Sequence, residues 1–140
     1  AHALGLGGRY VPGGGGPTPY ALQGFDGNLL TGDRTGFRRI AALVEQAGAR
    51  ALGGPTLGWL HAAFREIDAL RAASLATPAL ILLGGDEAVV SPKAIRDRAA
   101  RDGCALVELP GARHEPLFEG AETVSAVWSA IDGFLDDRGL

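Results

Sequence analysis

The sequence lacks several features that define particular protein classes. It has one cysteine, Cys104, so an internal disulfide is excluded, and with it a small disulfide-stapled domain. The apolar run at 79–83 is strand-length, far short of the roughly 18 residues that span a bilayer. The formal net charge of −3 offers no basic surface, so we expect no nucleic-acid partner. Methionine is absent even at position 1, so we expect the chain to be a piece of a longer protein.

What is present is typical of a globular α/β protein. Hydrophobic residues make up 46% of the chain and charged residues 21%, close to the average for soluble domains. Residues 1–36 are rich in glycine and proline and show no periodicity, which predicts a loop that is partly disordered. Residues 37–76 carry two helical patterns, which we expect to form a helical segment. The first pattern is closed by Gly48, and Thr56 is placed to cap the second.

Residues 77–140 predict the order strand, helix, strand, helix. The strands are expected at 79–83 and 104–109, and the helix between them begins at Ser91-Pro92, a cap followed by proline. This alternation is typical of α/β folds. Two strands are too few for a stable parallel sheet, so we expect the C-terminal portion of a larger domain. The alternative is a small α+β domain that completes its sheet by self-association.

Acidic residues and a histidine follow the two expected strands. Asp86 and Glu87 come after the first strand, and His114 follows the second. Ligand sites of parallel sheets gather at the carboxyl ends of the strands, so one carboxylate can reach the imidazole. A carboxylate bonded to histidine Nδ1 is the acid–base half of a serine hydrolase triad. Taken alone, the acidic pair and the histidine each fit a solvated surface turn better than a catalytic site.

The nucleophile of such a triad is missing from the sequence. No G-x-S-x-G elbow is present, and none of the four serines falls on a strand-to-helix turn. They are Ser74, Ser91, Ser125 and Ser129. This agrees with the expectation that the serine lies upstream of the chain.

Three segments resemble a known family. The stretch Gly111-Ala112-Arg113-His114-Glu115-Pro116-Leu117-Phe118-Glu119 is similar to the segment around the catalytic histidine of bacterial lysophospholipases of the L2 type. Residues 77–83, followed by Gly84, Glu87, Val89 and Val90, resemble the acid-bearing strand and turn of that family. Residues 53–59 resemble part of its cap region. These enzymes are related to monoacylglycerol lipases within the α/β-hydrolase superfamily, and the similarity covers about residues 30–138.

The resemblance implies a serine carboxylic-ester hydrolase. We expect no cofactor, and no metal site because His2, His61 and His114 are widely scattered and Cys104 has no partner cysteine. The resemblance also implies that His114 is the general base and Glu87 the acid, with Asp86 as the alternative acid. It places the helices of 37–76 in a cap, where Trp59, Leu60 and Phe64 are candidates for binding a lipid or acyl-ester substrate. It also implies a cytoplasmic protein, with peripheral contact to the inner membrane as an alternative.

Two other functions fit the same residues. The chain could be a non-catalytic remnant of an α/β-hydrolase that serves as an interaction module. It could also have another activity of the superfamily, because the acid and histidine positions are shared across it. An upstream G-x-S-x-G would favour the hydrolase, whereas a start codon close to residue 1 would favour the remnant.

Overall fold

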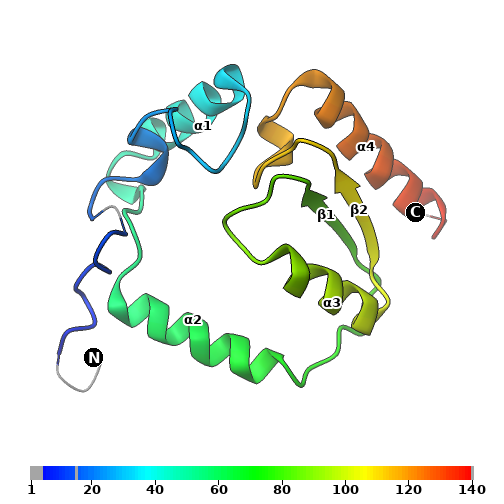
Figure 1. Ribbon diagram of the computed structural model, residues 1–140, viewed down its shortest axis with the longest axis horizontal. Coiled ribbons are helices and arrows are strands. Elements are labelled where there is room, and N and C mark those ends of the chain that lie inside the picture. The colour runs from blue at the N-terminus through cyan, green and yellow to red at the C-terminus, as the bar shows by residue number, and fades with distance from the viewer. Residues whose placement is uncertain (1–4, 15, 140) are drawn as a thin grey trace. The chain divides into compact units, whose positions relative to one another are not determined.

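The computed structural model describes residues 5–14 and 16–139, which form two compact units (Figure 1). One unit consists of the described residues up to Gly24 together with Ala41–Ser74. The other consists of Phe25–Ile40 and the chain from Leu75 onward. The second unit is therefore discontinuous in sequence, and the division differs from our expected boundaries at residues 36 and 76.

A parallel strand pair forms the centre of the second unit. Strands β1 (Leu80–Gly84) and β2 (Ala105–Leu109) pair with Leu80 opposite Ala105 and Gly84 opposite Leu109. Both strands therefore end at the same edge of the sheet. The structure confirms the expected parallel pairing and the positions of the strands to within one residue.

Helix α3 (Pro92–Asp102) connects the two strands. It begins as expected, because the Ser91 hydroxyl accepts a hydrogen bond from the Ala94 N–H and proline occupies the first turn. It ends at Gly103, whose φ of 66° is left-handed. Near this end, hydrogen bonds from Arg101 and then Arg98 outweigh desolvation and lower the pKa of Asp102 to about 2.

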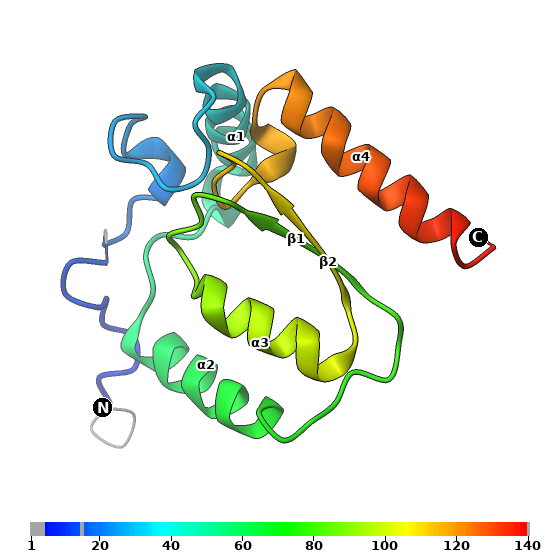
Figure 2. The ribbon, with the colours of Figure 1, turned by 45° about the vertical axis from the view of Figure 1, so that its right-hand side comes forward.

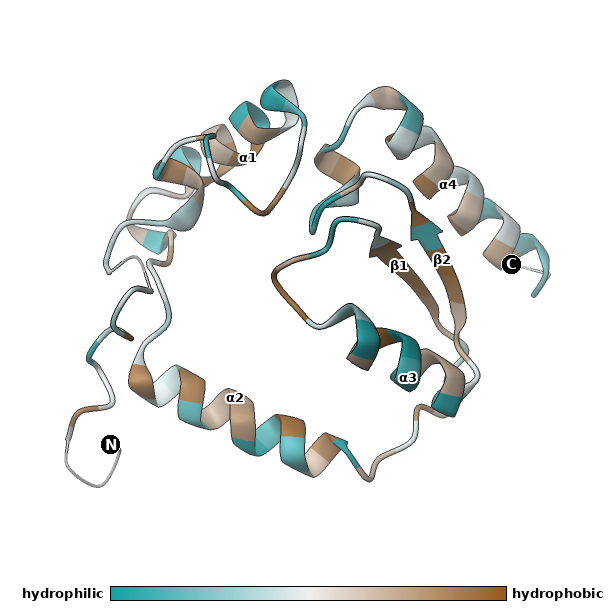
Figure 3. Ribbon diagram, in the orientation of Figure 1, coloured by the Kyte–Doolittle hydropathy of each residue, from teal (hydrophilic) through white to brown (hydrophobic). Residues whose placement is uncertain are grey.

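Helix α4 (Ala121–Asp136) covers the opposite face of the sheet from α3 (Figures 1 and 2). Its Val127 is fully buried and packs with Leu109 and Ala112. Strand β1 is hydrophobic up to Gly84 (Figure 3), yet only its last two residues are buried. We expected burial of this strand on both faces. In the described residues the sheet has two strands, so the edge of β1 away from β2 has no hydrogen-bonded neighbour. The first residues of β1 therefore stay partly exposed.

Residues 25–36 contribute to the second unit, although their sequence predicted only a loop. Helix α1 (Arg34–Ala47) begins three residues before the expected start at Phe37, because the Asp33 carboxylate accepts a hydrogen bond from the Gly36 N–H. Gly36 lies against the short 3₁₀ helix η4 (Pro116–Phe118). A Cβ at Gly36 would lie 1.6 Å from the Phe118 carbonyl oxygen, so only glycine fits there.

The first unit contains helix α2 (Leu57–Leu70) and the short 3₁₀ helices η2 (Tyr20–Leu22) and η3 (Gly48–Arg50). Thr56 caps α2 as expected, its hydroxyl accepting from the Trp59 N–H at 3.2 Å. An antiparallel bridge joins Tyr10 to Thr56, so part of the glycine-rich segment has a defined conformation. None of the helices that the structure describes combines the length and apolarity needed to cross a membrane.

Candidate active site

The acidic turn leaves β1 directly and is held against the end of β2. The Gly85 N–H donates to the Leu109 carbonyl at 2.8 Å, and the Asp86 N–H donates to the Ala112 carbonyl at 2.9 Å. The Glu87 N–H closes the turn by donating to the Gly84 carbonyl at 3.3 Å. These bonds fix the direction in which the Glu87 side chain leaves the sheet.

The histidine turn follows β2 at the same edge. Gly111 has a φ of 72°, a left-handed conformation that favours glycine and reverses the chain after Pro110. The turn approaches the end of β1 so closely that a Cβ on Gly84 would lie 2.3 Å from the Arg113 carbonyl oxygen. Glycine at position 84 therefore permits the contact between the two turns.

His114 and Glu87 meet at this edge. His114 Nδ1 lies 2.7 Å from Glu87 Oε2, within hydrogen-bond distance. The other carboxylate oxygen, Oε1, accepts from the Val89 N–H at 2.6 Å and the Val90 N–H at 3.1 Å. The Glu87 side chain is only 5% exposed, whereas that of His114 is 32% exposed. Glu87 is thus a fixed partner of a histidine that keeps access to solvent.

The electrostatics favour an ionised Glu87. Burial raises the pKa of its carboxyl, but the hydrogen bonds from His114 and from the two valine N–H groups outweigh burial, and the pKa lies below its ordinary value. An ionised carboxylate can only accept, so Nδ1 of His114 must carry the proton in this contact. Nε2 of the neutral ring is then left as an acceptor, the form that a general base needs.

The structure distinguishes the two expected acids by geometry. Glu87 contacts the imidazole, whereas Asp86 is exposed and joins the site only through its backbone N–H. The catalytic roles of His114 and Glu87 stay predictions, because a contact alone does not establish a reaction.

The described residues bring no serine to His114. Ser91 caps α3, Ser125 and Ser129 lie in α4, and Ser74 comes after the end of α2. In the part of the chain that the structure describes, none of these hydroxyls is hydrogen-bonded to the His114 ring. Within the described residues, the acid–histidine pair therefore has no serine hydroxyl bonded to it.

Several residues that hold the histidine turn were not singled out by the sequence. Thr31 is fully buried, and its hydroxyl donates to the Phe118 carbonyl at 2.9 Å. Nη1 of Arg113 donates to the carbonyl of Asn28 at 2.8 Å. The Glu119 carboxylate accepts from the backbone of Gly32 and Arg113. The sequence offered one signal for this support. An otherwise aperiodic segment contains the turn-forming residues Asn28, Thr31 and Asp33.

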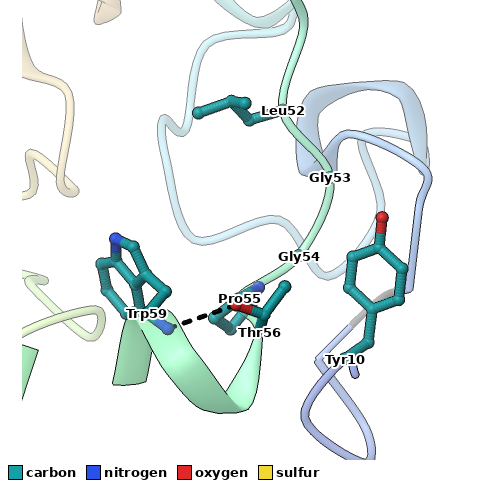
Figure 4. Close-up of a pocket in the computed structure, with 7 residues that line it drawn as sticks. All are labelled: Tyr10, Leu52, Gly53, Gly54, Pro55, Thr56 and Trp59. Atoms are coloured by element: carbon teal, nitrogen blue, oxygen red, sulfur yellow. Dashed lines mark hydrogen bonds between the residues drawn. The ribbon is translucent and has the colours of Figure 1, made fainter. Parts of the chain in front are cut away.

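The first unit contains an apolar cavity of about 490 Å³ that involves one of the expected substrate-binding residues. Trp59 lines it, and Figure 4 shows the Trp59 and Tyr10 side chains near the segment that leads into α2. Leu60 and Phe64 are not among its lining residues, which are Tyr10, Leu52, Gly53, Gly54, Pro55, Thr56 and Trp59. The volume lies within the range of small-molecule sites.

Comparisons with known proteins agree with this architecture. The chain is 31% identical over 136 residues to a probable lysophospholipase L2 from Haemophilus influenzae, an alignment covering 95% of this chain and 42% of that protein. The alignment includes most of the segment before residue 30, where we expected little similarity. No protein-family model matches the chain.

The fold is similar to that of a solved lipase. A soluble variant of monoglyceride lipase from Saccharomyces cerevisiae, crystallised with a substrate analogue, matches with a TM-score of 0.57 and 18% identity. The match covers 82% of this chain and 42% of the lipase. The chain thus spans less than half the length of the proteins it matches. It has part of the α/β-hydrolase fold: its sequence resembles that of the probable lysophospholipase L2, and its fold resembles that of the monoglyceride lipase.

Proposed function

We propose that the protein is a serine carboxylic-ester hydrolase of the lysophospholipase or monoacylglycerol lipase type. The observation that carries the proposal is the 2.7 Å contact between His114 Nδ1 and Glu87 Oε2 at the carboxyl edge of a parallel sheet. In the proposed reaction His114 is the general base and Glu87 orients it. The nucleophilic serine and the oxyanion donors belong to sequence outside these 140 residues.

The proposed reaction uses the two nitrogens of His114 differently. Nε2 takes the proton from the serine hydroxyl as the serine oxygen attacks the acyl carbonyl, and then gives it to the leaving alcohol. Water then attacks the acyl-enzyme with the same nitrogen as base, releasing the acid and restoring the serine. Throughout, Nδ1–H donates to Glu87, which stabilises the imidazolium while it carries the extra proton.

The proposed substrate is a lipid ester that binds by its acyl chain. The relatives' names refer to lysophospholipid and monoglyceride, and both contain an acyl ester. The apolar cavity beside Trp59 supports an acyl-binding role for the first unit. Trp59→Ala is then expected to raise KM for long-chain esters more than for acetate esters.

The test is hydrolysis of p-nitrophenyl acyl esters by the protein encoded by the complete reading frame. His114→Ala should lower kcat by about a thousandfold or more, since it removes the general base. Glu87→Gln should lower kcat far more than Asp86→Asn, which serves as the matched control on the neighbouring carboxylate.

The outcomes separate the proposal from its alternatives. The 140-residue chain alone should be inactive. If it hydrolyses the esters and loses this activity on mutation of one of its own serines, the nucleophile does not lie outside the chain. If the complete reading frame contains no nucleophile elbow and its product is inactive, the protein is a non-catalytic remnant. If Asp86→Asn is the more damaging change, the acid has been assigned to the wrong residue.

A further inference from the structure

Glu119 is a buried carboxylate whose hydrogen-bond partners are backbone groups. The residue is 9% exposed, and its Oε1 accepts from the Arg113 N–H at 2.9 Å and from the Gly32 N–H at 3.0 Å. Oε2 also lies 3.0 Å from the Gly32 nitrogen. Buried carboxylates are costly unless their oxygens are bonded, so this arrangement fixes the side chain in one place. Through these bonds Glu119 links Arg113, the residue before His114, to Gly32, which lies 87 residues before Glu119 in the sequence.

The same segment bonds to the histidine turn at two further residues. The His114 N–H donates to the Leu29 carbonyl at 3.4 Å, and the Glu115 N–H donates to the Leu30 carbonyl at 2.8 Å. Together with the Arg113 bond to Glu119, three consecutive backbone N–H groups around the imidazole are held. The backbone at position 114 therefore has little freedom to move away from the acidic turn.

The carboxylate is central to this arrangement because its one side chain bonds the backbone of both segments, at Arg113 and at Gly32. Without it, the N–H groups of half-buried Arg113 and of exposed Gly32 lose the acceptor that links them. The histidine turn would then be free to shift to recover those bonds with solvent. A shift at Arg113 moves the neighbouring residue, His114, relative to Glu87.

We propose that Glu119 is a positioning residue for His114, one that holds the imidazole against Glu87 by fixing the backbone of Arg113 and Gly32. The catalytic consequence rests on the hydrolase function proposed above. The geometric consequence does not, because it concerns only the contact between His114 and Glu87.

The experiment reads the His114 ring directly by NMR. The protein is labelled with ¹⁵N-histidine, and the His114 signals are assigned by their loss in His114→Gln. At neutral pH the wild-type ring should be mainly the Nδ1–H tautomer, as its contact with Glu87 requires. Glu119→Ala should bring the two tautomers towards equal populations and speed hydrogen exchange of the Arg113 amide. Glu119→Gln keeps one acceptor oxygen and should lie between Glu119→Ala and wild type.

Glu122→Ala, at an exposed carboxylate in the first turn of α4, is the matched control and should leave the His114 signals unchanged. The amide signals of β1 and β2 show whether each variant is folded. If Glu119→Ala does not fold, the Glu119→Gln variant decides, and a shifted tautomer ratio is required. An unchanged tautomer ratio in folded Glu119 variants overturns the proposal, as does a wild-type ring without the Nδ1–H preference.

If the complete enzyme is active, Glu119→Ala should lower kcat by about a hundredfold, the cost of displacing a catalytic group by roughly 1 Å, with little change in KM. A rise in KM with kcat unchanged would contradict the positioning role. Because the NMR measurement needs no turnover, the absence of hydrolysis would refute the proposed function and leave the test of Glu119 intact.

Discussion

Gly84 offers the sharpest test of how the acidic and histidine turns meet. A Cβ at this position would lie 2.3 Å from the Arg113 carbonyl oxygen and 2.5 Å from that of Ala112. Both are backbone atoms, so no side-chain rotation can relieve the clash, and Gly84→Ala must separate the turns by roughly 1 Å. Overpacking of this kind costs about 1–3 kcal/mol of unfolding free energy.

Gly133→Ala is the matched control. Gly133 lies inside α4, and a Cβ there meets no atom within 4 Å. Replacing a helical glycine by alanine should raise the unfolding free energy by about 0.5–1 kcal/mol. The two substitutions should therefore move the urea unfolding midpoint in opposite directions, measured by far-ultraviolet circular dichroism. If Gly84→Ala unfolds at the same urea concentration as wild type, the close approach of the two turns is wrong.

Three further predictions concern stability. Thr31→Val removes the hydroxyl from its two backbone partners and should lower the unfolding free energy by about 1–3 kcal/mol, whereas exposed Thr35→Val should change it by less than about 0.5. Ser91→Ala removes the cap of α3 and should cost about 1 kcal/mol in the same urea experiment. Hydrogen bonds, above all from Arg101, hold the pKa of Asp102 at about 2, below its ordinary value. Wild type should therefore have a higher unfolding free energy than Asp102→Asn, and this difference should be fully present above pH 4. It should disappear as the pH falls through 2, and a difference that persists to lower pH would contradict this assignment.

The local elements could be predicted because their signals lie within a few residues. Ser91-Pro92 and Thr56 mark helix starts through their own side chains, and the apolar run after Pro78 marks a strand. Parallel pairing followed from the helix between the strands, since a crossover of this kind brings both carboxyl ends to one edge. These expectations needed no knowledge of distant residues.

The support of the site could not be predicted from such signals. Contacts between Gly32 and Glu119 join backbone to side chain across 87 residues and leave no periodic pattern in either segment. The choice between Glu87 and Asp86 was also open to residue-level reasoning, because adjacent acids after a strand both reach a neighbouring turn. The resemblance favoured Glu87, and the structure supplies the contact.

The discontinuity of the second unit has a consequence for how this architecture tolerates change. Its two parts meet through Thr31, Gly32 and Glu119, and the intervening Ala41–Ser74 belongs to the other unit. In sequence that stretch is an insertion into the second unit, and it begins inside helix α1 (Arg34–Ala47) and ends after helix α2 (Leu57–Leu70). Exchange of residues 48–74, which begin after the end of α1, should therefore leave the pairing of His114 with Glu87 in place. The residues that pair His114 with Glu87 and those that hold the histidine turn all belong to one of the two units.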